Sequence, residues 1–316
     1  MLVIETDGLT KDFPVGFWRP RPYRALDHLT LAVEPGEVFG FLGPNGAGKS
    51  TAIKLLMQLI FPTSGTARIL GRPVGVVEMR RRIGFLPENP AFYDYLTAEE
   101  LLTYFASLFD MPASARAARV ATVLDEVGIG AERRMRLRSY SKGMVQRVGI
   151  AQAIINEPEV VFFDEPMSGL DPLGRRDVRQ LMLRLRDRGC TVFFSSHILS
   201  DAEALCSQVA IIAQGKLAAS GRLSDILGTD VLGWELVVDR VSPDGLALLR
   251  AKARALTELP DGRYAADLPP DPPEAALQEL SAAGAQIVSL NPLRKTLEDV
   301  FVTLVGQAAG RETAGL

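Results

Sequence analysis

Nine consecutive residues, Gly43–Thr51 (GPNGAGKST), combine the residue types that bind phosphate. Their glycines allow the backbone to wrap closely around an anion, with the amide N–H groups pointing inward. The start of a following helix adds partial positive charge. Lys49 can reach the terminal phosphates of a nucleotide, and the Ser50 hydroxyl can hold Mg²⁺. The residues expected to bind the nucleotide here are Gly43, Pro44, Asn45, Gly46, Ala47, Gly48, Lys49, Ser50 and Thr51.

The segments on either side of this stretch support phosphate binding. The apolar run Val38–Leu42 predicts a buried strand, and residues 52–59 place apolar side chains at helical spacing. Strand, glycine-rich turn and helix is the context that a phosphate loop requires. A plain turn between two core elements is the alternative, and the flanking strand and helix argue against it.

Two adjacent carboxylates follow another apolar strand. Val160–Phe163 runs directly into Asp164 and Glu165. Neighbouring side chains on a strand point apart, so the two acids are expected to have separate roles. We assign Asp164 to holding Mg²⁺ through water, and Glu165 to polarising the attacking water as general base. The structural alternative is a pair of acids that cap the next segment; the phosphate loop upstream favours the catalytic role.

Length and composition restrict the class of protein. The 316 residues suggest one large or two modest domains, and 47% hydrophobic residues are enough for a core. The net charge of −3 provides no basic surface for nucleic acid. No apolar run approaches the ~18 residues that span a bilayer, and we see no signal peptide. Any membrane role is therefore expected to come through a separate partner. Cys190 and Cys206 are expected to be reduced, buried thiols in the cytosol.

Buried strands alternate with helices over the first two thirds of the chain, which predicts an α/β sheet that is largely parallel at its centre. Residues 13–23 contain three prolines and a glycine and are predicted to form a loop. The composition changes after about residue 228. Residues 228–306 are predicted to form a small α+β domain with a loop over 259–273, and 307–316 a flexible tail.

These motifs resemble those of the ATPase domain of ATP-binding cassette (ABC) transporters. That family has a signature helix that starts with Leu-Ser-Gly-Gly-Gln, and here Tyr140–Met144 reads YSKGM. Ser141 and Gly143 match, whereas Lys142 replaces a glycine and Met144 replaces the glutamine. Segments 160–166 and 168–171 resemble the family's strand-end carboxylates and dimer loop. His197 resembles the histidine that senses the γ-phosphate, although a lone histidine is often structural.

The resemblance implies a fold class and a domain organisation. We expect a P-loop NTPase of the ABC ATPase type over residues 1–227, with a parallel sheet core and a helical subdomain at about 88–157. Glu88 stands where the family usually has glutamine; it could bind Mg²⁺ or water, while adding negative charge near the phosphates. Phe13 fits the place of the adenine-stacking aromatic if residues 15–21 are an insertion. Trp18 and Tyr23 remain competitors for that role.

The resemblance also implies a function. ATP on Gly43–Thr51 of one subunit would be closed by Ser141 and Gly143 of a second, in a homodimer that hydrolyses ATP with Mg²⁺. The C-terminal part, with Leu297–Phe301, resembles the appendage of bacterial multidrug, lipid or polysaccharide exporter ATPases. We therefore expect a peripheral subunit on the cytoplasmic face of the inner (plasma) membrane, which powers export of an unknown substrate through a separately encoded integral membrane permease.

Two alternatives belong to other classes of protein. One is a soluble, non-transport ABC-type ATPase that acts on ribosomes or DNA. Such proteins usually carry two cassettes or a long coiled-coil insertion, and this chain shows neither. The other is a nucleotide-bound regulatory module without turnover, which Lys49, Asp164, Glu165 and His197 argue against.

Overall fold

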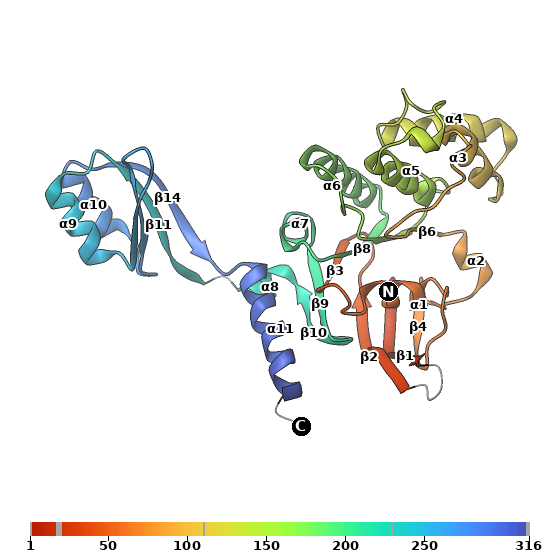
Figure 1. Cartoon of the computed structure of the whole chain (residues 1–316), viewed down its shortest axis with the longest axis horizontal. Coiled ribbons are helices and arrows are strands. Elements are labelled where there is room, and N and C mark those ends of the chain that lie inside the picture. Colours follow the sequence, from red (N-terminus) through yellow and green to blue (C-terminus); the bar gives the residue numbers. More distant parts are fainter. Residues whose placement is uncertain (1, 17–20, 110, 229, 314–316) are drawn as a thin grey trace. The chain divides into compact units, whose positions relative to one another are not determined.

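The computed structural model describes residues 2–16, 21–109, 111–228 and 230–313. It divides into two compact units, one of Met1–Leu223 with Phe301–Leu316 and the other of Ser224–Val300. The first unit holds every residue proposed above for nucleotide chemistry (Figure 1). In the part of the chain that the structure describes, no helix combines the length and the apolar character needed to cross a lipid bilayer.

A six-stranded sheet in the order β10-β9-β3-β8-β7-β6 forms the centre of the first unit. Every neighbouring pair is parallel except β9 with β10, so the predicted α/β sheet with a parallel centre is confirmed. Parallel strands end at one edge of a sheet, which brings the segments after β3, β7 and β8 together. The strands are β3 (Val38–Leu42), β6 (Ile83–Leu86), β7 (Val160–Asp164), β8 (Thr191–Ser196), β9 (Gln208–Ala213) and β10 (Lys216–Arg222).

Four phenylalanines join three of these strands. The Phe193 ring on β8 lies 5.4 Å from Phe39, 5.5 Å from Phe41 and 5.5 Å from Phe162, measured between ring centroids. All four side chains are fully buried. Aromatic pairs of this kind add to the free energy that burial already supplies. The polar residues at the ends of these strands are therefore supported by a tightly packed apolar layer.

The helices of the first unit begin and end at recognisable sequence signals. Thr97 and Glu100 form a reciprocal capping box at the start of α3, and Ser141 and Asp171 cap α5 and α6 with their side-chain oxygens. Helices α3, α4 and α5 pack on one another within the span predicted for the helical subdomain (Figure 1). The helices are α1 (Lys49–Leu56), α2 (Val77–Arg80), α3 (Ala98–Ser107), α4 (Ala113–Glu126), α5 (Lys142–Ile154), α6 (Pro172–Asp187) and α7 (Leu199–Leu205), with a 3₁₀ turn at Leu137–Ser139.

Both cysteines are buried and free. Burial raises the pKa of the Cys190 thiol to about 12, and it raises that of the Cys206 thiol further. Both groups are therefore protonated at neutral pH and poorly reactive.

A second sheet, in the order β2-β1-β4-β5, is antiparallel. Residues 13–23 were predicted to form a loop, and this prediction is wrong in part. Strands β1 (Ile4–Val15) and β2 (Arg21–Val33) form a long hairpin that extends into this segment. Phe13 faces Tyr23, and Pro14 faces Pro22. The prolines are tolerated because β2 is an edge strand and because the pairing of β1 with β4 ends at Thr10. The remaining strands are β4 (Ser64–Ile69) and β5 (Arg72–Pro73).

In the second unit an antiparallel sheet in the order β12-β13-β11-β14 packs with helices α9 and α10. The predicted loop over 259–273 is wrong in part. Within it, β13 (Tyr264–Leu268) alternates in burial, and Ala266 and Leu268 are buried; prolines and acids on either side hide this short strand in the sequence. The other elements are α8 (Leu223–Leu227), β11 (Val231–Asp239), α9 (Pro243–Lys252), β12 (Ala255–Glu258), α10 (Glu274–Ala282) and β14 (Gln286–Arg294).

The helix α11 (Leu297–Thr313) extends into the segment predicted to be a flexible tail. It continues through most of residues 307–316. Glutamine, alanine, arginine and glutamate are good helix formers, and they dominate this segment.

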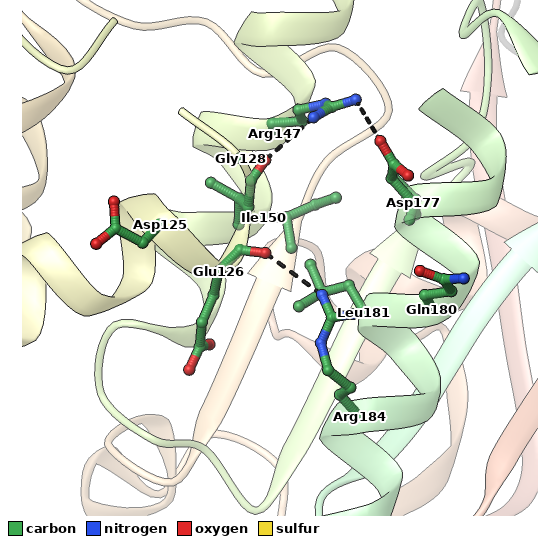
Figure 2. Close-up of a pocket in the computed structure, with 11 residues that line it drawn as sticks. Asp125, Glu126, Gly128, Arg147, Ile150, Asp177, Gln180, Leu181 and Arg184 are labelled. Atoms are coloured by element: carbon green, nitrogen blue, oxygen red, sulfur yellow. Dashed lines mark hydrogen bonds and ion pairs between the residues drawn. The ribbon is translucent and has the colours of Figure 1, made fainter. Parts of the chain in front are cut away.

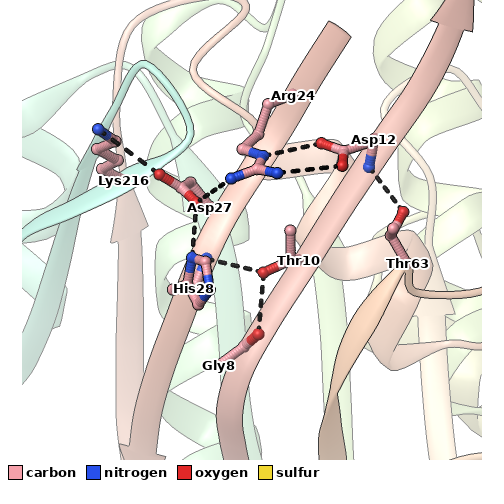
Figure 3. Close-up of polar contacts among 8 residues, drawn as sticks. All are labelled: Gly8, Thr10, Asp12, Arg24, Asp27, His28, Thr63 and Lys216. Atoms are coloured by element: carbon pink, nitrogen blue, oxygen red, sulfur yellow. Dashed lines mark hydrogen bonds and ion pairs between the residues drawn. The ribbon is translucent and has the colours of Figure 1, made fainter. Parts of the chain in front are cut away.

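A polar network fixes the hairpin formed by β1 and β2 (Figure 3). Arg24 Nε lies 2.9 Å from Asp12 Oδ1, and its Nη1 lies 3.0 Å from Asp27 Oδ1. Asp27 also contacts His28 Nδ1 at 2.7 Å and Lys216 Nζ of β10 at 3.6 Å. Asp12 and Arg24 are opposite each other, next to the pair Phe13 and Tyr23. The network therefore supports the part of the hairpin that carries both rings.

The charges in this network alter the acid–base behaviour of its carboxyls. The side-chain hydrogen bond from Arg24 holds the pKa of Asp12 below its ordinary value. For Asp27, the hydrogen bond with His28 is the main cause of a lowered pKa, and Arg24 adds to it. A carboxyl whose pKa is depressed by folding stabilises the fold above its unfolded pKa. That contribution is lost as the pH falls through the folded pKa.

Replacing Arg24 with glutamine should raise the pKa of Asp12 toward its ordinary value, because the guanidinium that favours the carboxylate is gone. The stability of the hairpin should then depend less on pH in the acid range where Asp12 titrates. A carboxyl-detected NMR titration measures both changes. R263Q is the matched control, since Arg263 pairs with Asp261 in the second unit. An unchanged Asp12 titration in R24Q would contradict the assigned cause.

Candidate nucleotide-binding site

The loop between β3 and α1 has a backbone that only glycine permits at two points. Gly48, the N-cap of α1, has φ 106°, and a Cβ there would lie 2.5 Å from the Ala25 carbonyl oxygen. A Cβ on Gly43 would lie 2.5 Å from the Ile212 carbonyl oxygen. The loop is therefore packed directly against backbone on two sides. Because α1 begins at Lys49, the N–H groups of its first turn lack partners within the helix.

This loop, the hairpin and two acids line one cavity of about 390 Å³. Its volume suits a small-molecule ligand. Gly43, Pro44 and Ala47 of the predicted set are not in the lining. Trp18, one of the three aromatic candidates, lies outside the described residues. The lining residues are Phe13, Tyr23, Ala25, Asn45, Gly46, Gly48, Lys49, Ser50, Thr51, Glu88 and Glu165.

Lys49 is a buried ammonium, 5% exposed, and it has three oxygen neighbours. Its Nζ donates to the carbonyl oxygens of Gly43 at 2.7 Å and Pro44 at 3.2 Å. The third is Glu165 Oε1 at 3.2 Å. A buried ion pair is tolerated when hydrogen bonds satisfy the rest of each group, and the two carbonyls do this for the ammonium.

Glu165 connects the ammonium to an imidazole. Its Oε2 lies 2.8 Å from His197 Nδ1, and its buried Oε1 has no hydrogen-bond partner within the described residues, facing Lys49 as an ion pair only. Glu165 has φ 50°, a left-handed conformation that is uncommon for a residue with a side chain. Its N–H donates to Ser195 Oγ at 2.9 Å. Such strain persists where the surroundings hold it, and it often marks a functional site.

Asp164 has a separate set of partners. Its Oδ1 accepts from Ser50 Oγ at 3.1 Å and from Ser195 Oγ at 2.7 Å, and the residue is 3% exposed. The two adjacent acids therefore have different partners; strand β7 ends at Asp164, and the left-handed backbone of Glu165 turns its side chain toward Lys49 and His197. Ser195 is a site residue that sequence reasoning missed. The only signal for it was a hydroxyl at the end of an apolar strand, just before His197.

The oxygens around Ser50 fit a magnesium ion. Mg²⁺ usually takes one or two protein oxygens and fills its other positions with water and phosphate. Ser50 and Asp164 are in contact, and Glu88 lines the same cavity as Ser50. Across the described residues there is no group of three or more histidine, cysteine, aspartate or glutamate side chains that could hold a metal alone.

Ser141 and Gly143 do not reach the cavity that contains Lys49. They line another pocket, of about 440 Å³, together with Gly169, Leu170 and Asp171. Ser141 Oγ accepts from the Met144 N–H at 3.3 Å, and Asp171 Oδ1 accepts from the Gly174 N–H at 2.8 Å. Two helix N-termini thus lie at this pocket, whose lining contains Lys142 and Arg147 as well as Glu132 and Asp171.

Two contacts tie α5 to the rest of the site. Gln146, 2% exposed, donates through Nε2 to the Pro166 carbonyl oxygen at 3.2 Å, one residue beyond Glu165. Figure 2 shows Arg147 of α5 pointing toward Asp177 of α6, with Nη2 and Oδ2 2.9 Å apart. The start of α5 is therefore linked to the loop after the catalytic candidate. None of these contacts was predicted from the sequence.

Comparison with known proteins agrees with this geometry. A family model described as "ABC transporter" matches residues 26–168. An uncharacterized ABC transporter ATP-binding protein of Synechocystis is 44% identical over 95% of this chain and 84% of its own length. The daunorubicin/doxorubicin resistance ATP-binding protein DrrA of Streptomyces peucetius is 34% identical over 97% of this chain and 93% of its own. The bacitracin transport ATP-binding protein BcrA of Bacillus licheniformis is 41% identical over 68% of each chain.

Solved structures show the same fold. The structure of an ATP-binding subunit of an ABC transporter superposes with a TM-score of 0.62 and 32% identity, over 72% of this chain and 92% of that one. A dimeric ATP-binding cassette in a post-hydrolysis state bound to ADP and Pi has a TM-score of 0.64 at 24% identity, over 70% of this chain and 98% of that one, and this likeness concerns the fold. The chain belongs to the ABC transporter family, among its ATP-binding proteins.

Proposed function

We propose that this chain binds Mg·ATP and hydrolyses it as one half of a homodimer that drives export through a separate membrane permease. The observation that carries the proposal is the position of Glu165. Its carboxylate lies between the Lys49 ammonium and the His197 imidazole, in the cavity lined by the glycine-rich loop. A base, an orienting group and a phosphate-binding cation are thus assembled at one place.

The contacts suggest how these side chains act. Loop N–H groups and Lys49 neutralise the terminal phosphates. Ser50 with Asp164 would hold Mg²⁺, which would supply further positive charge beside the phosphate oxygens. A triphosphate competes with Glu165 for the Lys49 ammonium. Once Lys49 turns to phosphate, Glu165 Oε1 is free to accept a proton from the attacking water. His197 holds Oε2 and so fixes the orientation of the base.

Replacing Glu165 with glutamine should lower steady ATP turnover by about 100-fold or more while ATP still binds, because the amide cannot accept the proton. Phosphate release and calorimetric titration measure the two properties separately. E274Q, the same change on an exposed position of α10, is the matched control. Unchanged turnover in E165Q would show that Glu165 is not the base.

The base of the nucleotide is assigned to the hairpin. Phe13 and Tyr23 face each other across β1 and β2, and both line the cavity. The Lys11 ammonium lies 5.0 Å from the Phe13 ring centroid. Such a cation is attracted to the face of an aromatic ring and helps to hold the ring in place. We infer that Phe13 stacks on adenine and that Tyr23 borders it.

Phe13→Ala should weaken ATP binding roughly tenfold, since stacking of a base on an aromatic ring is worth about 1–3 kcal/mol. Tyr23→Ala should have a smaller effect. Calorimetric titration of both variants shows which substitution weakens ATP binding more. Phe61→Ala serves as control, because Phe61 is a phenylalanine of the same unit that is 67% exposed. A larger loss in Y23A than in F13A would reverse the assignment.

The dimer is inferred from an incomplete site. Ser141 and Gly143 line a pocket separate from the Lys49 cavity of the same chain. A second copy can bring its α5 N-terminus to the nucleotide, where N–H and hydroxyl groups stabilise phosphate charge. Export and a permease partner are inferred from the relatives, which include proteins named for drug resistance and for bacitracin transport. On the same basis we infer that the chain acts as a peripheral subunit at the cytoplasmic face of the inner membrane.

An exposed aromatic group suggests where the permease binds. Tyr93 and Tyr95 are 61% and 59% exposed, with ring centroids 5.8 Å apart. They follow Glu88, which lines the nucleotide cavity. Movement of this segment on nucleotide binding would therefore be passed to a protein that contacts the two rings. Exposed aromatic side chains of this kind are common at protein interfaces.

Replacing Tyr93 and Tyr95 with serine should reduce co-purification of the permease from detergent-solubilised membranes several-fold, because the two rings would no longer be buried in the interface. ATP turnover of the isolated chain should be unchanged. Mass spectrometry of material purified with tagged wild type, the double variant and the control F61S makes the comparison. Co-sedimentation with ribosomes and no multispan membrane protein would support the soluble ATPase instead.

A further inference from the structure

Lys142 is a residue that the proposed function leaves unused. It stands where the family signature has glycine, and it is the first residue of α5, directly after the cap Ser141. A lysine is unfavourable at this position, because the N-terminus of a helix is already positive. The side chain is exposed and lines the pocket that also contains Ser141 and Gly143. Within the described residues Lys142 forms no ion pair.

The Lys142 side chain has a defined position over Gly169. A Cβ built on Gly169 would lie 2.7 Å from Lys142 Nζ, 3.0 Å from its Cε and 3.2 Å from its Cδ. The lysine therefore extends along the glycine backbone, in space that any other residue would fill. Gly169 has φ +70°, which also favours glycine. Because Gly169 has no side chain, it leaves room for the aliphatic part of the Lys142 side chain.

Gly169 belongs to the loop that joins Glu165 to α6. Gly143 also contacts that loop, since a Cβ on it would lie 3.3 Å from Leu170 Cδ2. The Lys142 ammonium thus lies between the α5 N-terminus and the loop that follows Glu165. It adds a full positive charge beside the N–H groups expected to close on a partner's nucleotide.

We propose that Lys142 is a specificity-determining residue of nucleotide-dependent dimer closure. Its ammonium, seated over Gly169, binds the terminal phosphate of the ATP held by the other subunit. This inference rests on the proposed function, because it requires ATP and a second copy. The lysine favours closure on a triphosphate over a diphosphate, since only the triphosphate presents the last phosphate to it.

Dimerisation of the full chain with the substitution Glu165→Gln tests the proposal, because hydrolysis is then absent. Light scattering during an Mg·ATP titration gives the ATP concentration for half-maximal dimerisation. K142M keeps the stem over Gly169 and removes the charge, and it should raise that concentration roughly tenfold. K142R keeps the charge and should stay near the parent, and K252Q, a lysine of the second unit, is the charge control. ATP binding by dilute monomer should not change.

Salt provides a second measurement. Dimerisation of the parent should weaken with rising sodium chloride more steeply than that of K142M, because an exposed ammonium–phosphate contact is screened. Equal half-maximal concentrations and equal salt dependence in parent and K142M would overturn the role of Lys142 alone. A parent that binds no Mg·ATP, or that binds it without dimerising, would overturn the proposed function and this inference with it.

The contact between Lys142 and Gly169 is tested by a pair of substitutions. Gly169→Ala introduces the same backbone strain in every background, but its Cβ clashes only with a lysine at position 142. It should therefore raise the half-maximal ATP concentration more in the parent than in K142G. Equal effects in the two backgrounds would show that the lysine does not rest on Gly169.

Discussion

The Glu165 carboxylate lies between two nitrogen groups, the Lys49 ammonium at 3.2 Å and the His197 ring at 2.8 Å. It is 7% exposed, so its charge depends on these neighbours and not on water. Phosphate would bind the same ammonium, so the ion pair and the ligand compete. The rest of the site is arranged around this competition. The Gly43 carbonyl of the glycine-rich loop orients Lys49, and the left-handed backbone of Glu165 orients its carboxylate. The Ser195 hydroxyl accepts from the Glu165 N–H and donates to Asp164 Oδ1.

Distances this short between three distant segments require a stiff support. The parallel sheet supplies it, because β3, β7 and β8 are adjacent and end at one edge. The phenylalanines around Phe193 join the same three strands from within. The hairpin and α5 lie outside this support. The hairpin with Phe13 is held by exposed ion pairs, and α5 is held through Gln146 and Arg147. Such contacts can change when nucleotide binds while the strand ends stay in place.

In the proposed function, the site in one chain is half of a larger one. The glycine-rich loop and the α5 N-terminus line different pockets, and a helix begins at each of them. The hydrogen bond from Gln146 of α5 to Pro166, the residue after Glu165, connects the two pockets. A displacement of α5 at one pocket can therefore be transmitted to Glu165 at the other. In a dimer, the closing surface of one subunit would thus be connected to its own catalytic base, and the two nucleotides would be coupled through protein contacts.

Local signals in the chain were enough to predict a glycine-rich loop between a strand and a helix, two acids at the end of a strand and a parallel sheet. Each of these depends on neighbours in sequence: glycine spacing, an apolar run, a carboxylate at its end. Only the tertiary structure decided which aromatics line the cavity, that β1 and β2 extend through the proline-rich segment, that Ser195 bridges the two acids and that Lys142 rests on Gly169. These features join residues far apart in the chain or at a sheet edge, where propensity is weak and packing determines the outcome.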